Sequence, residues 1–146
     1  MVDFPNADQN RTTCWTGGTR TCTHFPGSSR RNSGRTQLIV YHFLFGPDAE
    51  AGCPGCSWVT DAMSHPAHLH ARNTSLVLIS RASIEKLVAF RARMGWDVPW
   101  YSSLHSDFNY DFNATNAQGE NHVTSVFLRD GNDIYRTYYT DQRGVE

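Results

Sequence analysis

The segment that most constrains the fold is an apolar run at residues 38–45, Leu-Ile-Val-Tyr-His-Phe-Leu-Phe, interrupted by a single histidine. A β-branched and aromatic run without polar alternation is typical of a strand that is buried on both faces. Gly46 and Pro47 end the run, and a loop then leads to Cys53-Pro54-Gly55-Cys56. A strand of this kind needs covering layers on both sides, so an α/β domain is expected.

A helix and a second strand are predicted after this first strand. Pro54 suits the first position of a helix, where its missing N–H group has no partner to lose, so a helix is predicted over residues 54–69. Pro66 is expected to break or kink that helix near its end. The apolar residues 76–79, Leu-Val-Leu-Ile, form the second predicted buried strand.

The second helix has signals at both of its ends. It is predicted over residues 84–94, between an N-cap at Ser83 and a C-cap glycine at Gly95. Its predicted apolar face is made of Ile84, Leu87, Val88 and Met94.

The remainder of the chain predicts a hairpin. Residues 96–121 are aromatic and polar and are predicted as mostly loop, with a short strand near Trp100. The strand-like residues 125–128 and 134–139 flank Asp130-Gly131, which is a strong hairpin signal. The earlier crossovers imply parallel pairing, so a mixed sheet flanked by helices is predicted.

Residues 1–36 differ from the rest of the chain. They contain few aliphatic residues and no helical or strand period, so this atypical leader is predicted to be poorly structured, and the folded domain is expected over residues 37–146. A formal net charge of −1 gives no reason to expect a nucleic acid or a membrane surface as partner. No run resembles a secretory signal or a bilayer span, so a cytoplasmic location is expected. In that reducing compartment, cysteines indicate redox or metal chemistry.

The pair Cys53 and Cys56 has the spacing and position of a redox-active dithiol, at the start of a helix that follows a buried strand. The unpaired amides and the positive dipole end at that position favour the thiolate form of Cys53. Cys56 lies one turn further along and is predicted to be more buried, where it would attack a mixed disulfide on Cys53. Pro54 and Gly55 would allow a tight entry and close approach of a partner. A zinc half-site or inert cysteines are the alternatives.

Several segments of the chain resemble those of a known protein family. They are residues 37–48, 52–57 (Gly-Cys-Pro-Gly-Cys-Ser), 80–82, 85–87, 94–96, 106–112 (Ser-Asp-Phe-Asn-Tyr-Asp-Phe) and 125–131. With them the chain resembles the thioredoxin-like domain-of-unknown-function family number 899, whose members are described as predicted dithiol-disulfide oxidoreductases. The resemblance implies a thioredoxin-like fold with Cys53 and Cys56 as the candidate dithiol. It implies no substrate.

The chain departs from that pattern in three places. The leader differs from that of the family, and Val123 or Thr124 stands where many thioredoxins have a cis-proline. The C-terminal helix of a thioredoxin-like domain is missing, and the domain is expected to be truncated. A missing helix would leave apolar side chains of the first and last strands facing water, so the chain is expected either to self-associate or to be marginally stable and aggregate. The candidate residues are Leu38, Val40, Val126, Leu128, Tyr135 and Tyr139.

One loop and one tryptophan are further candidates for supporting roles. Asp107, Tyr110 and Asp111 combine two carboxylates and a phenol in one loop, which either relays protons to the dithiol or, as we favour, forms ordinary turns close to the cysteines. Trp58, one turn into the first helix, is expected to pack rather than to react.

No metal site is assigned from the sequence. The histidines at positions 65, 68 and 70 are interpreted as exposed, and Cys14 and Cys22, with His24 nearby, as incidental.

The sequence thus predicts a thiol-disulfide oxidoreductase without a cofactor, in which Cys53 attacks and Cys56 resolves. Its partners would be a protein or small-molecule disulfide and an electron donor that the sequence does not identify. A peroxiredoxin-like peroxide reductase is a variant, although Glu50 stands where those enzymes usually have threonine. The rival interpretation is a non-catalytic thioredoxin-like module that binds zinc or another protein.

Overall fold

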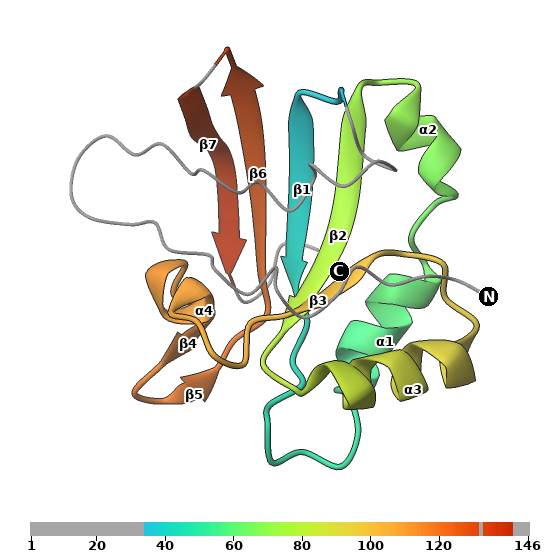
Figure 1. The fold of residues 1–146 in the computed structure, drawn as a ribbon, viewed down its shortest axis with the longest axis vertical. Coiled ribbons are helices and arrows are strands. Elements are labelled where there is room, and N and C mark those ends of the chain that lie inside the picture. Colours follow the sequence, from blue (N-terminus) through green and yellow to red (C-terminus); the bar gives the residue numbers. More distant parts are fainter. Residues whose placement is uncertain (1–33, 132, 142–146) are drawn as a thin grey trace.

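The computed structural model describes residues 34–131 and 133–141, which form a five-stranded mixed sheet with helices on both faces (Figure 1). The strand order is β3-β2-β1-β6-β7. The central strand β1 pairs in parallel with β2 and antiparallel with β6, so both crossovers and the hairpin follow the prediction. The strands are β1 (Gln37–His42), β2 (Thr74–Ser80), β3 (Trp100–Ser102), β6 (Val123–Asp130) and β7 (Asp133–Asp141).

Four helices and a small second hairpin complete the described part of the chain. The helices are α1 (Pro54–Asp61), α2 (Pro66–His70), α3 (Ile84–Met94) and α4 (Phe108–Asp111). The hairpin joins β4 (Thr115–Asn116) to β5 (Gly119–Glu120). In Figure 1, α1 and α3 lie together beside β1 to β3, and α4 lies with β4 and β5 on the other side of the molecule.

Alternation along β1 divides the core into two layers. Tyr41, with Phe43 just beyond the strand, packs against α1 and α3 on what we call the α1/α3 face. Leu38 and Val40 point to the opposite side, the α4 face, where they pack with Phe112 just after α4. The long apolar run is therefore buried on both faces, as predicted, although the regular strand ends at His42.

The helix predicted over residues 54–69 is two helices. The first ends at Asp61, and Pro66 begins the second, in which the His65 Nδ1 atom accepts a hydrogen bond from the Ala67 N–H group. Proline lacks the N–H group that a continuing helix needs but suits a first turn, so Pro66 starts a helix instead of ending one.

The ends of α3 are as predicted, but its packing face is not. The Ser83 hydroxyl accepts a hydrogen bond from the Lys86 N–H group, and Gly95 has φ 69°, the left-handed conformation that glycine tolerates. The buried residues are Leu87 and Phe90, with Met94 partly buried. Val88 is exposed because it lies about 100° around the helix axis from Leu87, and Ile84, in the first turn, is exposed as well.

The segment at residues 96–121 has more structure than the predicted loop. Its short strand at Trp100 is confirmed, but α4 and the β4–β5 hairpin were not predicted. No helix within the described ranges is long and apolar enough to cross a membrane.

Large apolar side chains are exposed on the edge strand β7. Tyr135 and Tyr138 on this strand are about half exposed. Leu38 and Val40, in contrast, are completely buried, so these two candidates for an uncovered face are not at the surface.

Candidate active site

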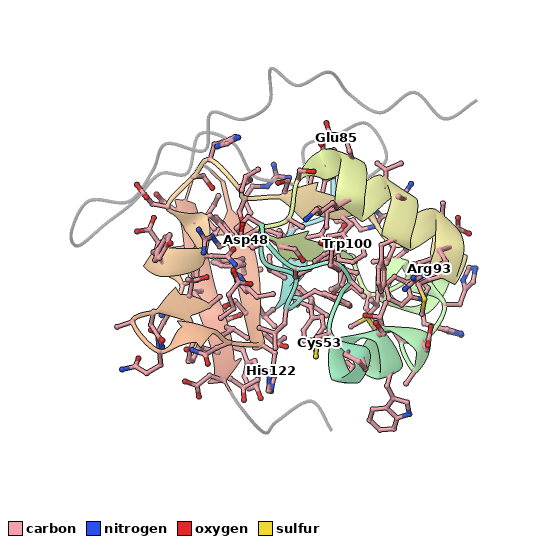
Figure 2. All side chains as sticks on the ribbon, turned by 90° about the horizontal axis from the view of Figure 1, so that it is seen from below. Asp48, Cys53, Glu85, Arg93, Trp100 and His122 are labelled. Carbon is pink, nitrogen blue, oxygen red and sulfur yellow. The ribbon has the colours of Figure 1, made fainter. Side chains whose placement is uncertain are left out.

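Cys53 is the N-cap residue of α1 and lies just beyond the carboxyl end of β1. Its N–H group donates a hydrogen bond to the Leu44 carbonyl oxygen at 3.0 Å, which ties the start of the helix to the end of the strand. The side chain is partly exposed and makes no capping hydrogen bond, so its sulfur is free to meet a partner. Figure 2 shows Cys53 at the start of α1, with its sulfur towards the outside of the molecule.

The two residues between the cysteines leave that approach open. Pro54 occupies the first helical turn, as predicted, and is exposed. Gly55 is also exposed, and a Cβ atom there would lie 3.8 Å from the Cys53 sulfur, in ordinary contact. A larger side chain than glycine would begin to cover the thiol, so Gly55 keeps the sulfur accessible.

The loop before Cys53 is held against the core at two points. A Cβ atom at Gly52 would lie 2.7 Å from Cε1 of Phe43, closer than real side chains approach, so only glycine fits there. The Lys86 ammonium group donates hydrogen bonds to the carbonyl oxygens of Pro47 at 2.8 Å and Ala49 at 2.9 Å. These contacts fix where the chain enters α1 and therefore where Cys53 lies.

Cys56 is the buried member of the pair, with 3% of its surface exposed. Burial raises the pKa of its thiol to about 11, and the neighbouring Cys53 adds to the increase. Two hydrogen bonds act in the other direction by stabilising the thiolate: one from the Tyr41 phenol and one from the Leu44 backbone N–H group. Both thiols are free, so the structure holds a reduced dithiol with one accessible and one buried sulfur.

Tyr41 was not predicted as a site residue. It is 2% exposed and lies on the α1/α3 face, where its phenol bonds Cys56. Burial raises the pKa of Tyr41 far above its ordinary value, and the hydrogen bond to Cys56 adds to this, so the phenol keeps its proton. The alternation of the β1 sequence could place Tyr41 on a buried face, but it could not show that α1 covers that face.

Thr124 is one of the two residues that the sequence placed at the cis-proline position of thioredoxins, but it was not predicted as a site residue. In the antiparallel register it is the direct partner of Tyr41, so both side chains lie on the same face. It is 8% exposed, and its hydroxyl has no hydrogen-bond partner among the described residues. Within the described part of the chain, the Thr124 hydroxyl is therefore a buried polar group without a partner on the sheet face of Tyr41.

The loop with Asp107, Tyr110 and Asp111 belongs to the other side of the sheet. All three side chains are exposed, and the aromatic residues around them, Phe108 and Phe112, pack against His42 on the α4 face. The loop was expected close to the cysteines, but the structure anchors it on the sheet face opposite Cys56.

The partner of Tyr110 is Arg81. The Arg81 guanidinium lies 5.0 Å from the centre of the Tyr110 ring, and Arg81 also forms an ion pair with Glu120 at 3.3 Å. Burial raises the pKa of Glu120, and Arg81 offsets part of that increase. This cluster joins the end of β2 to the β4–β5 hairpin.

The remaining predicted residues do not converge on the cysteines. Trp58 is 64% exposed, so it does not pack as expected. The histidines at positions 65, 68 and 70 are exposed, and no group of three potential metal ligands occurs within residues 34–131 and 133–141. Cys14, Cys22 and His24 lie outside the described residues, as does most of the leader.

The sheet order, the buried first strand and the dithiol at the start of the first core helix define a thioredoxin-fold protein. The chain belongs to the family described as bacterial protein of unknown function (DUF899), whose model matches residues 32–146. A search of curated proteins found no match to the chain.

Solved structures with a similar fold are peroxiredoxins. A cysteine mutant of PrxQ from Xylella fastidiosa has a TM-score of 0.62 and 17% identity, covering 77% of this chain and 70% of that one. Peroxiredoxin Q from Xanthomonas campestris has a TM-score of 0.56 and 18% identity, with coverages of 83% and 76%. The Xanthomonas campestris bacterioferritin comigratory protein, described for its alkyl peroxide reduction activity, has a TM-score of 0.60 and 15% identity, with coverages of 89% and 78%. At these identities the similarity establishes the fold.

Proposed function

We propose that this protein is a thiol-disulfide oxidoreductase in which Cys53 attacks a substrate disulfide and Cys56 resolves the product. The observation that carries the proposal is the asymmetry of the pair: Cys53 is partly exposed at a helix N-terminus, and Cys56 is buried one turn later. An accessible thiol can meet a substrate, while a buried neighbour is shielded until the first bond forms.

The reaction balances with the two thiols alone. The Cys53 thiolate attacks one sulfur of the substrate disulfide, forms a mixed disulfide and expels the first substrate thiolate. Cys56 then loses its proton and attacks the Cys53 sulfur, which forms the Cys53–Cys56 disulfide and expels the second thiolate. The substrate gains two electrons and the dithiol loses two, so a thiol donor must restore the reduced pair. We expect this cycle to run in the reducing cytoplasm without a cofactor.

Peroxide reduction is the second candidate, because the solved structures of similar fold are peroxiredoxins. There the Cys53 thiolate would attack a peroxide oxygen, becoming a sulfenic acid and releasing an alcohol or water. Cys56 would condense with the sulfenic acid to give the same disulfide and one molecule of water. Glu50 at the position where those enzymes usually have threonine favours disulfide exchange as the main reaction.

The decisive experiment compares single-cysteine variants. A full-length Cys14→Ser/Cys22→Ser double variant serves as control, because it keeps only the dithiol, and it is expected to be fully active. In that background, Cys56→Ser should accumulate a mixed disulfide with an oxidised peptide, detected by mass spectrometry, and Cys53→Ser should form none. Turnover that survives Cys53→Ser would refute the proposal. A sulfenic acid formed faster with peroxide than the mixed disulfide with peptide would favour the second candidate.

A further inference from the structure

We propose that Tyr41 is a positioning residue for the second chemical step, in which its phenol donates a hydrogen bond to the Cys56 sulfur as that sulfur attacks. This inference rests on the proposed function and assigns a role within it. It concerns the resolving thiol, because the hydrogen bond of Tyr41 is with Cys56, whereas Cys53 acts on Tyr41 only through its charge.

The placement of Tyr41 follows from the fold. It is the next-to-last residue of the central strand β1, and β2 and β6 hold that strand from both sides. Its side chain is 2% exposed within the same core cluster as Cys56. Because strand pairing fixes the backbone and packing fixes the ring, the phenol is held at the Cys56 sulfur before any substrate arrives.

Leu44 supplies a second donor to the same sulfur. Its N–H group bonds Cys56, and its carbonyl oxygen accepts the Cys53 N–H group at 3.0 Å. One peptide segment thus holds both cysteines in register. The Cys56 sulfur thus has two donors. The Leu44 N–H group remains in any side-chain variant, whereas the Tyr41 phenol is removed by a single substitution.

The resolving step needs such donors. A thiol must lose its proton to become the nucleophile, and a bare thiolate is costly in a buried site. In this step the Cys56 sulfur bonds to the Cys53 sulfur, the bond from Cys53 to the substrate breaks, and the departing thiolate takes up a proton. Tyr41 keeps its own proton throughout, because its burial strongly disfavours the phenolate. Its contribution is therefore a hydrogen bond that strengthens as negative charge appears on Cys56.

The test separates the two chemical steps within one reaction. The full-length protein with Cys14→Ser and Cys22→Ser is mixed with the aromatic disulfide dithiobis-nitrobenzoate, which releases a coloured thiolate twice. The first release reports attack by Cys53, and the second reports attack by Cys56. Tyr41→Phe should leave the first rate unchanged and slow the second about ten- to hundredfold, the range expected for one hydrogen bond to a charged group. The pH midpoint of the second rate should move upwards.

A matched control and three outcomes make the test decisive. Tyr101→Phe removes a phenol on the α4 face and should leave both rates as in the parent protein. An unchanged second rate in Tyr41→Phe would overturn the inference and leave the proposed function standing. Equal slowing of both rates with a lower Tm would also overturn it, since the role would then be structural. A first release that persists in Cys53→Ser would instead overturn the proposed function.

Discussion

Acid should destabilise this protein through His42, a buried histidine unrelated to the dithiol. His42 is 1% exposed, and its ring stacks on Phe108 with the ring centres 5.4 Å apart. Neither ring nitrogen has a hydrogen-bond partner of good geometry among the described residues. Burial lowers its pKa to about 4; the nearby Asn109 amide offsets part of the decrease, and the charge of Arg136 adds to it.

The size and sign of the effect follow from that pKa. Between about pH 6.5 and pH 4 the unfolded chain binds a proton at His42 and the folded protein does not. Protonation therefore favours unfolding, and stability is lost as the pH falls through this range. The difference between 6.5 and about 4 corresponds to about 3 kcal/mol. That is a large part of the 5–15 kcal/mol, roughly, by which domains are stable.

Urea unfolding at a series of pH values measures this loss. His42→Phe keeps an aromatic ring against Phe108 and removes the titrating group. Between pH 6.5 and 4 the free energy of unfolding of this variant should therefore fall by about 3 kcal/mol less than that of the wild type. Glu120, with its raised pKa, acts in the opposite direction in both proteins and cancels from the comparison. His68→Gln, at an exposed histidine, should keep the wild-type pH dependence. Parallel curves for wild type and His42→Phe would refute the reasoning.

Two further predictions concern packing. Gly52→Ala should lower the free energy of unfolding by about 1–3 kcal/mol, because the added methyl group collides with Phe43. Gly55→Ala, where the methyl group makes only ordinary contact with the Cys53 sulfur, should cost nothing measurable in urea titrations. A Gly52→Ala protein of wild-type stability would show that the loop can shift away. The exposed Tyr135 and Tyr138 should promote self-association, which Tyr135→Ser/Tyr138→Ser should reduce in sedimentation velocity. A wild-type protein that stays monomeric at high concentration would contradict this.

Local signals in the sequence predicted both ends of α3 correctly, but they did not predict which of its faces packs against the sheet. The cap at Ser83 and the glycine at Gly95 act through the backbone of their own turn, so both ends of α3 were predicted correctly. Which side of α3 faces the sheet depends on strands distant in sequence, so Val88 was assigned wrongly to the buried face. The same dependence explains why the apolar packing of Trp58 was predicted wrongly.

The sequence predicted the two cysteines of the candidate site but not the residues that surround them. The spacing of Cys53 and Cys56 and the strand before them indicated which cysteine would be buried, and the structure confirms that difference. Tyr41 could not be assigned, because its contact with Cys56 requires α1 to cross one particular face of β1. For the loop at Asp107, the sequence likewise contains no signal for the face on which α4 lies.

The position of β1 in the sheet has a consequence for how the protein is made. This strand, early in the domain, pairs on one side with β6, so that Gln37 meets Leu128. On a translating ribosome, β1 and β2 can associate first, but one edge of the most apolar strand stays open until nearly the whole domain has emerged. During that interval the unpaired edge of β1 makes the nascent chain most open to aggregation, although the core cluster around Cys56, which is made of residues 41–100, can already form.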